Sequence, residues 1–186
     1  MLTISTPRLL LRPLRTADAE AVLAYRSDPD IIRYQTWHPV DLREIRDYIR
    51  EQSGCIPGMP GIWYQLAIIS LHSDDLLGDC GVHVSLDDPA SAELGITLKR
   101  EAQHQGFAGE VLRGLIGYCF STMHMHMITA RIFSKNQPAL NLVERNGFVF
   151  RGRVDTRLDT EMEDCDLVYS LASATFHASH TIITTR

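Results

Sequence analysis

One strand–turn–helix segment limits most strongly what this chain can fold into. Residues 94–98 read as a short strand, residues 103–109 form a turn of small residues, and apolar positions then recur at helical spacing in Val111, Leu112, Leu115 and Ile116. A helix that begins after such a turn has several backbone N–H groups without partners at its N-terminus. These N–H groups and the helix dipole predict a site for an anionic group, either a phosphate or a pyrophosphate.

The glycines of this turn are open to a simpler interpretation. Gly106 permits close approach of a ligand to the backbone, and Ala108 and Gly109 keep side chains small, yet such residues also shape turns between packed elements. The turn is neither a G-x-x-x-x-G-K-[ST] P-loop nor a dinucleotide-binding G-x-G-x-x-G. Spacing alone therefore leaves open whether the turn binds phosphate.

Composition excludes several classes of protein. The 186 residues are 45% hydrophobic, which predicts one globular domain with its own core. A net charge of −5 argues against nucleic acid or an anionic membrane as partner and permits a cationic substrate such as an amine. The cysteines form no C-x-x-C pair, no apolar stretch has the length of a membrane span, and no signal-peptide pattern is present. We therefore expect a cytoplasmic protein.

Hydrophobic periodicity and turn signals predict the remaining elements. Thr16, with Glu20 as capping-box partner, is expected to begin a helix at residues 17–27, and Asp41 one at residues 42–52. Further helices are predicted at 108–123 and 138–146, and strands at 8–14, 63–71, 76–86, 92–98, 127–133, 148–154 and 166–171.

These elements predict an α/β (α+β) fold. The expected architecture is a twisted, mixed and mostly antiparallel sheet of six to seven strands with helices on both faces. Residues 1–172 are expected to form a single domain. Residues 173–186 are a Ser- and Thr-rich tail that is either disordered or packed on a partner.

Two groups of residues have a functional and a structural interpretation. His124 and His126 alternate with methionines, but two ligands without a third make a poor metal site, so no metal is expected. Trp37, Trp63 and Tyr64 are expected to pack in the core.

The hexapeptide at residues 103–108, Q-H-Q-G-F-A, resembles the [RQ]-x-x-G-x-[GA] motif with which the GNAT superfamily of N-acetyltransferases binds the pyrophosphate of acetyl-CoA. Three other blocks occur in the order of that family's RimJ/RimL-type branch and cover nearly the whole chain. Residues 6–14 resemble its first strand, residues 92–95 its fourth, and Asn136 with residues 144–148 its N-x-x-[SA] … E-x-x-G-F helix. Together the blocks are more specific than any one of them.

The resemblance implies how acetyl-CoA would be bound. The backbone of Ile96 and Leu98 would pair with the pantetheine arm, and the Ile96 N–H would polarise the thioester carbonyl. Asn136 would contact CoA, a role compatible with capping the helix that follows it. The amides that would hold the pyrophosphate belong to Gln103, His104, Gln105, Gly106, Phe107, Ala108 and Gly109.

The resemblance also names a general base and lacks a general acid. Glu93 would deprotonate the amine, although a Glu on an alternating strand is commonly a surface carboxylate. His83 is the alternative titratable group and is more typical of a structural histidine. Val143 and Ala139 stand where many family members have the Tyr or Ser that protonates the thiolate.

Two positions of the turn also depart from the family pattern. His104 replaces a residue that is often Gly, and Gly109 one that is often Thr or Ser. Neither change should abolish phosphate binding, because backbone amides supply the donors.

The implied function is transfer of an acetyl or other acyl group from its CoA thioester to a primary amine through a direct ternary complex. The amine would belong to a protein N-terminus or a small molecule, and the protein would be a monomer or homodimer with no nucleic-acid or membrane partner. Trp37 and His38, the loop at 54–61 and residues 155–164 would contact the acceptor. The alternative is a non-catalytic module that binds acyl-CoA as a sensor or scaffold.

Overall fold

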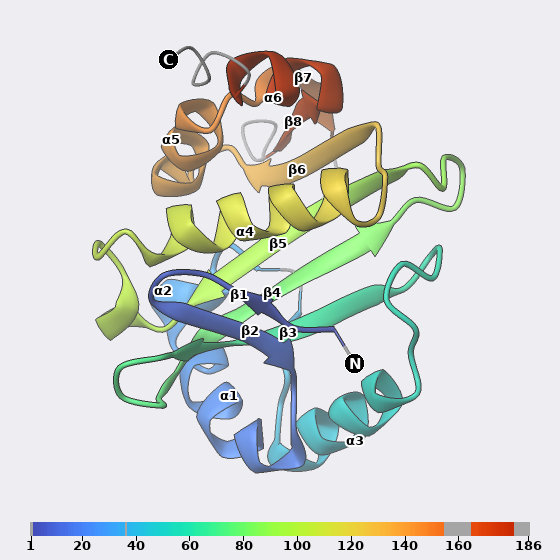
Figure 1. The fold of residues 1–186 in the computed structure, drawn as a ribbon. Coiled ribbons are helices and arrows are strands. Elements are labelled where there is room, and N and C mark those ends of the chain that lie inside the picture. Colours follow the sequence, from blue (N-terminus) through green and yellow to red (C-terminus); the bar gives the residue numbers. More distant parts are fainter. Residues whose placement is uncertain (1, 36, 155–164, 181–186) are drawn as a thin grey trace.

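The fold is built on an eight-stranded open sheet (Figure 1). The structure, a computed structural model, describes residues 2–35, 37–154 and 165–180, with side chains to residue 176. The strand order is β1-β2-β3-β4-β5-β6-β8-β7, and every neighbouring pair is antiparallel except β5 and β6. The strands are β1 (Ile4–Ser5), β2 (Leu9–Pro13), β3 (Trp63–Ser70), β4 (Leu76–Val84), β5 (Ser91–Leu98), β6 (Met127–Phe133), β7 (Val149–Val154) and β8 (Asp166–Ala172).

The helices cover the two faces unequally. Leu66 and Ile68 of β3 belong to the large core cluster that α4 and α5 complete, whereas Ala67 and Ile69 belong to a smaller cluster with α1 and α3. Because neighbouring side chains of a strand point to opposite faces, α4 and α1 lie on opposite sides of the sheet, as Figure 1 shows. The helices are η1 (Thr16–Asp18), α1 (Ala19–Arg26), α2 (Pro29–Ile32), α3 (Leu42–Ser53), η2 (Arg100–Ala102), α4 (Phe107–Ser121), α5 (Gln137–Arg145) and α6 (Ser173–His180).

The expected mixed α/β fold is confirmed, with one more strand than expected. Strand β1 pairs with β2 over only Ile4 and Ser5, and a two-residue strand has no recognisable alternation of its own. Asp41 caps α3 as expected, since its carboxylate accepts a 2.8 Å hydrogen bond from the Glu44 N–H.

The expected cap of the first helix is wrong. Thr16 lies inside η1, and α1 begins only at Ala19. Asp18 is the N-cap of α1 but makes no side-chain cap bond to it. Its carboxylate instead accepts from the Arg15 N–H at 2.7 Å, at the start of η1, and binds the Arg12 guanidinium through two hydrogen bonds. Arg12 lies on β2, so the Asp18 carboxylate joins η1 to the sheet.

The first part of the C-terminal tail forms a helix. The side chain of Phe176 in α6 lies beside Phe120 of α4, with ring centroids 5.3 Å apart. Residues 173–180 thus pack on the chain's own core, and residues 181–186 lie outside the described residues. Among the helices that the structure describes, none combines the length and apolar character needed to cross a bilayer.

Candidate active site

The parallel strands β5 and β6 separate halfway along their length. Their register runs from Ser91↔Met127 to Glu93↔Thr129 and stops there, although β5 continues to Leu98. In an antiparallel pair, alternate residues direct both backbone polar groups to the same neighbour. Ser91 accepts from Ser85 (3.0 Å) and Lys99 donates to Leu77 (2.9 Å), so the odd-numbered residues of β5 face β4.

The even-numbered residues of β5 therefore face the side from which β6 diverges. The 3.3 Å hydrogen bond from the Thr129 hydroxyl to the Ala92 carbonyl confirms this parity. Ile96 and Leu98 lie beyond the last β5–β6 pair, so their N–H groups point to a position with no neighbouring strand in the described part of the chain. The two residues expected to pair with pantetheine thus expose unpaired strand N–H groups.

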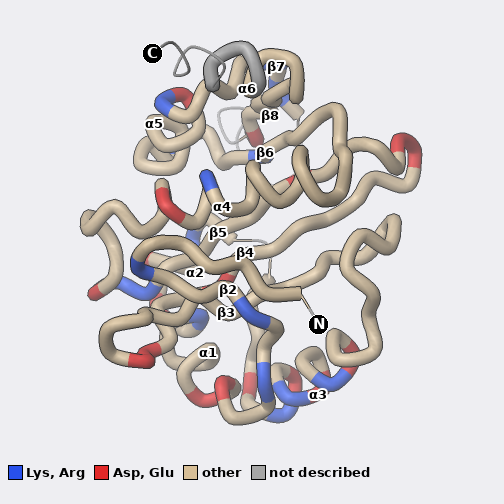
Figure 2. Tube along the Cα trace, in the orientation of Figure 1, with Lys and Arg blue, Asp and Glu red and all other residues tan. Residues whose placement is uncertain are grey.

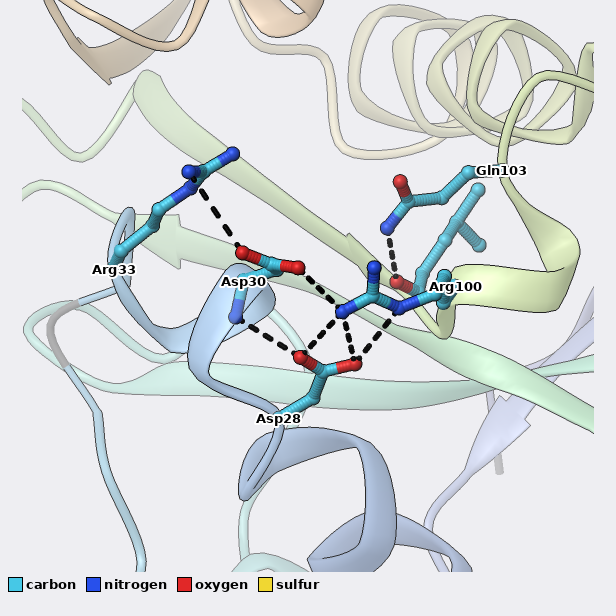
Figure 3. Close-up of polar contacts among 6 residues, drawn as sticks. Asp28, Asp30, Arg33, Arg100 and Gln103 are labelled. Carbon is cyan, nitrogen blue, oxygen red and sulfur yellow. Dashed lines mark hydrogen bonds and ion pairs between the residues drawn. The ribbon is translucent and has the colours of Figure 1, made fainter.

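Gln103 completes the end of β5. Its side-chain amide donates to the Leu98 carbonyl at 3.1 Å (Figure 3), and its backbone N–H donates to Arg100 at 3.1 Å within the turn of η2. The sequence prediction placed the Gln103 amide among the phosphate donors, but this N–H is already bonded. Gln103 instead positions the strand end beside the turn that follows.

The remaining amides of the turn are available. Within the described residues, no hydrogen-bond partner is present for the N–H groups of His104, Gln105, Gly106, Phe107, Ala108 and Gly109. The first helical bond at this end is made by the Glu110 N–H to the Gly106 carbonyl, at 3.2 Å. Gly106 has φ +81°, a left-handed conformation that glycine adopts without strain and that turns the chain into α4. Consecutive unpaired amides at a helix N-terminus can bind an anion, so this turn is a candidate anion site.

Glu110 lies next to this anion site, and its charge is compensated. Its side chain is buried and accepts from the Thr6 hydroxyl at 2.6 Å, the Arg8 N–H at 2.8 Å and the Arg8 Nε at 2.7 Å. Burial alone would raise the pKa of Glu110, but these hydrogen bonds and the Arg8 charge outweigh it and lower the pKa. The Arg8 guanidinium also donates to the Gln105 carbonyl at 3.1 Å, so Thr6 and Arg8 join the start of β2 to the turn.

A second guanidinium lies beside Gly109, at the start of α4. A Cβ added at Gly109 would lie 3.2 Å from Nη1 of Arg113, which is one helical turn further along α4. Helical side chains lean toward the N-terminus, which explains how Arg113 reaches back over Gly109. Arg8, at Gly106, and Arg113, at Gly109, therefore both place a guanidinium beside the turn.

An ion-pair cluster connects this region to α2. Nη2 of Arg100 lies 2.9 Å from Oδ1 of Asp28 and 2.6 Å from Oδ2 of Asp30, as Figure 3 shows. The hydrogen bond from Arg100 is the main reason that the pKa of Asp28 is lowered. The cluster fixes α2 beside η2, immediately before the anion-binding turn.

The proposed base lies on the face of the sheet opposite α4. Glu93 stands across from His83 in the β4–β5 register and is half-buried. Burial raises the pKa of Glu93, and the positive charge of Arg131, whose Nη2 is 3.9 Å from Oε2, acts against that shift. The carboxyl is therefore partly desolvated, and its role as base stays a prediction.

Trp63 is not a core residue, contrary to expectation. It is 37% exposed, and its ring centroid lies 5.3 Å from that of His83. The other two aromatic residues do pack inside: Tyr64 is buried, and Trp37 packs against the α1–α3 cluster with its ring 4.6 Å from that of Tyr48. The continuous apolar character of β3 predicted burial along its whole length. Trp63, its first residue, is not part of the cluster that α1 and α3 cover.

The two acceptor residues expected from sequence lie near α3. His38 is exposed, and Trp37 lines a pocket with Tyr48 and charged residues of α3, where Figure 2 shows both signs of charge. This pocket includes neither Glu93 nor Ile96, so the structure does not bring it together with the proposed reaction centre. Residues 155–164, also expected to contact the acceptor, lie outside the described residues, and the role of the loop at 54–61 stays a prediction.

Asn136 caps α5. Its Oδ1 accepts from the Ala139 N–H at 3.3 Å, which confirms the capping role, while its contact with CoA stays a prediction. Val143 is buried and Ala139 packs against the same core, so neither position offers a proton donor.

His124 and His126 lie before strand β6. Strand β6 begins only at Met127, His124 has φ +56°, and Nε2 of His126 lies 3.4 Å from Asp88. In the part of the chain that the structure describes, no three His, Cys, Asp or Glu side chains gather at a metal-binding spacing.

Comparison with known proteins identifies the family. Residues 8–149 match the model of the acetyltransferase (GNAT) domain. The chain is 30% identical over 153 residues to the uncharacterized N-acetyltransferase p20 of Bacillus licheniformis, covering 82% of this chain and 85% of the relative. It is 27% identical to the uncharacterized N-acetyltransferase YoaA of Bacillus subtilis, covering 80% and 84%.

Solved structures show the same fold. A GNAT-family acetyltransferase from Bacillus anthracis superposes with a TM-score of 0.80 at 22% identity, covering 93% of this chain and 99% of that one. A spermidine N-acetyltransferase from Vibrio cholerae, solved with CoA and spermine, gives 0.77 at 18% identity, covering 91% and 98%. From its domain match and its relatives, this chain belongs to the GNAT family and is an acetyltransferase.

Proposed function

We propose that this enzyme transfers an acetyl group from acetyl-CoA to a primary amine in a direct ternary complex. One observation carries the proposal: along the chain, the unpaired N–H groups of Ile96 and Leu98 lie between the half-buried carboxyl of Glu93 and the unpaired amides of residues 104–109. The N–H groups of Ile96 and Leu98 would pair with the pantetheine arm, the amides of residues 104–109 would bind the pyrophosphate, and Glu93 would face the reacting amine.

The donor is held by backbone. The N–H groups of residues 104–109 bind the pyrophosphate, and the guanidinium groups of Arg8 and Arg113 add positive charge beside it. The edge of β5 at Ile96 and Leu98 pairs with the amides of pantetheine as a missing strand would. Asn136, at the start of α5, contributes a further polar contact.

The chemical step needs a base and an oxyanion donor. The amine nitrogen attacks the thioester carbon, and the Ile96 N–H stabilises the negative charge that develops on the carbonyl oxygen. Glu93 accepts a proton from the amine, directly or through water. The C–S bond then breaks, CoA leaves as a thiolate, and the thiolate takes a proton from solvent because Val143 and Ala139 supply none.

The finer assignments follow the same residues. We assign the enzyme to the RimJ/RimL-type branch, because Thr6 and Arg8 of its N-terminal block have a defined task in holding Glu110. We place it in the reducing cytoplasm, which suits the free thiols of Cys55, Cys80, Cys119 and Cys165. The acceptor amine belongs to a small molecule or a protein N-terminus, and the enzyme acts as a monomer or homodimer.

Two measurements test this function. Isothermal calorimetry with acetyl-CoA should show saturable binding, and thiol release over a panel of primary amines should show turnover. Glu93→Gln should leave the Kd for acetyl-CoA within about twofold and slow turnover by about 100-fold or more, the usual contribution of a general base. Absence of binding at millimolar acetyl-CoA would refute the function, and binding without thiol release from any amine would identify a sensor.

A further inference from the structure

We propose that Trp63 is the residue that binds the acceptor, and that its indole holds the ammonium form of a primary alkylamine beside Glu93. This inference rests on the proposed function, because it names the acceptor class at the same site. Sequence reasoning gave Trp63 a core role, and the structure gives it an exposed position on the reaction face.

The strand register brings Trp63 to this face. Trp63 of β3 stands across from His83 of β4, which stands across from Glu93 of β5. Residues directly across from one another on neighbouring strands point to the same face of a sheet. The indole, the imidazole and the carboxyl therefore form one row across three strands.

A pair of glycines lets the indole lie flat along this face. Gly81 stands across from Gly95, and a Cβ at Gly81 would lie 2.8 Å from Cε3 of Trp63. A Cβ at Gly95 would lie 3.4 Å from Cζ3. The six-membered ring thus reaches from β3 to β5 and lies on Gly95, the residue that directly precedes Ile96.

A polar cluster with a buried carboxylate lies beside Gly81. The Gln65 side chain lies 2.5 Å from the Cβ position of Gly81 and donates to Asp79. Asp79 is buried and also accepts from the Tyr25 hydroxyl and the Arg26 guanidinium. Gln65 and the indole therefore both lie against the position where Gly81 has no side chain, and Trp63 stays 37% exposed.

The chemistry around the indole selects a cation. The face of an indole attracts an ammonium through its π electrons, and a carboxyl beside it adds a second attraction. Arg131 lies on the β6 side of Glu93, which leaves the β4 side, where Trp63 and His83 lie, for the incoming amine. The carbon atoms next to the amine would rest on the indole, which favours alkylamines over strongly hydrated polyhydroxylated amines.

Fluorescence and kinetics together test this assignment. The probe is n-butylammonium, compared with 1-butanol, added to the protein saturated with CoA so that no reaction occurs. We expect a saturable fluorescence change with n-butylammonium in the wild-type enzyme, no saturable change with 1-butanol, and loss of the change in Trp63→Leu. In turnover with acetyl-CoA, Trp63→Leu should raise the KM for n-butylamine by roughly tenfold or more. Trp63→Phe keeps a weaker π face, so its KM should lie between those of the wild-type enzyme and Trp63→Leu. The Kd for acetyl-CoA should stay within about twofold throughout.

Two further variants make the test specific. Gly81→Ala displaces the indole without removing it and should also raise the KM for n-butylamine, whereas Phe150→Leu, which changes an exposed ring on β7, should leave it unchanged. An unchanged KM in Trp63→Leu, or equal binding of 1-butanol and n-butylammonium, would overturn the inference. Failure of the wild-type enzyme to bind acetyl-CoA would instead refute the proposed function, so the two failures are distinguishable.

Discussion

Replacing Gly106 by valine tests the anion-binding turn at its most constrained residue. Gly106 has φ +81° and ψ 1° and directly precedes the first residue of α4. An L-residue in this left-handed conformation is strained by about 1–2 kcal/mol, and more when the side chain is β-branched. Space is not the obstacle, because the nearest atom to an added Cβ is Nη2 of Arg8 at 3.5 Å.

The strain has a direct consequence for binding. The chain relieves it by rotating φ at residue 106, and this rotation redirects the N–H groups of Phe107 and Ala108, which we assign to the pyrophosphate. Each hydrogen bond to a charged group contributes about 1.5–3 kcal/mol, so losing two weakens binding by about 3–6 kcal/mol. A loss of 3 kcal/mol alone corresponds to a Kd about 100-fold higher.

Calorimetric titration with acetyl-CoA measures this loss, and urea unfolding measures the strain. Gly106→Val should lower the free energy of unfolding by about 1–2 kcal/mol and raise the Kd by about 100-fold or more. Gly152→Val is the matched control, since nothing lies within 4 Å of an added Cβ there, and it should change neither quantity appreciably. A Gly106→Val enzyme that binds acetyl-CoA within threefold of wild type, on the order of experimental error in such comparisons, would refute the role of these amides.

Three other predictions concern the base, the buried ion pair and the long helix. Glu93 must be ionised to act as a base, and burial raises its pKa, so on acidification kcat/KM should begin to fall at a pH above the ordinary pKa of Glu. Arg131→Gln removes a charge that favours the ionised form and should move this acidic limb of the pH profile to higher pH. Asp79→Ala leaves the buried Arg26 guanidinium unpaired and should lower the free energy of unfolding, measured by urea titration, by about 3–5 kcal/mol. Recovery of that free energy in an Arg26→Met, Asp79→Leu double variant would show that the unpaired charge was the cause. Gly117→Ala, inside α4 with open space around the added methyl group, should raise the melting temperature through a gain of about 0.5–1 kcal/mol, and a decrease would contradict the helix geometry.

Helices, strands and caps were predictable from the sequence where they depend on the pattern of neighbouring residues. The strand at residues 127–133 and the Asp41 cap of α3 agree with the sequence prediction because alternation and capping depend on neighbouring residues. The turn at Gly106 was predictable for the same reason, since a glycine-rich turn between a strand and a helix constrains the backbone locally.

The supporting contacts were not predictable from local pattern. Glu110 and Arg8 are separated by 102 positions, and nothing near either residue indicates that they bind each other. The exposure of Trp63 depends on which strands α1 and α3 cover, and its flat position depends on Gly81 and Gly95 being paired across β4 and β5. Whether the Gln103 N–H is free to bind phosphate likewise depends on η2, because this N–H donates to the Arg100 carbonyl in the turn of η2.

A crystal structure of the enzyme with acetyl-CoA bound tests the central claim most directly. We expect pyrophosphate oxygens within hydrogen-bonding distance of the N–H groups of residues 104–109, and the thioester carbonyl oxygen facing the Ile96 N–H with Glu93 on the acceptor side. Acetyl-CoA bound away from the β5 edge, or with its carbonyl directed away from Ile96, would contradict it.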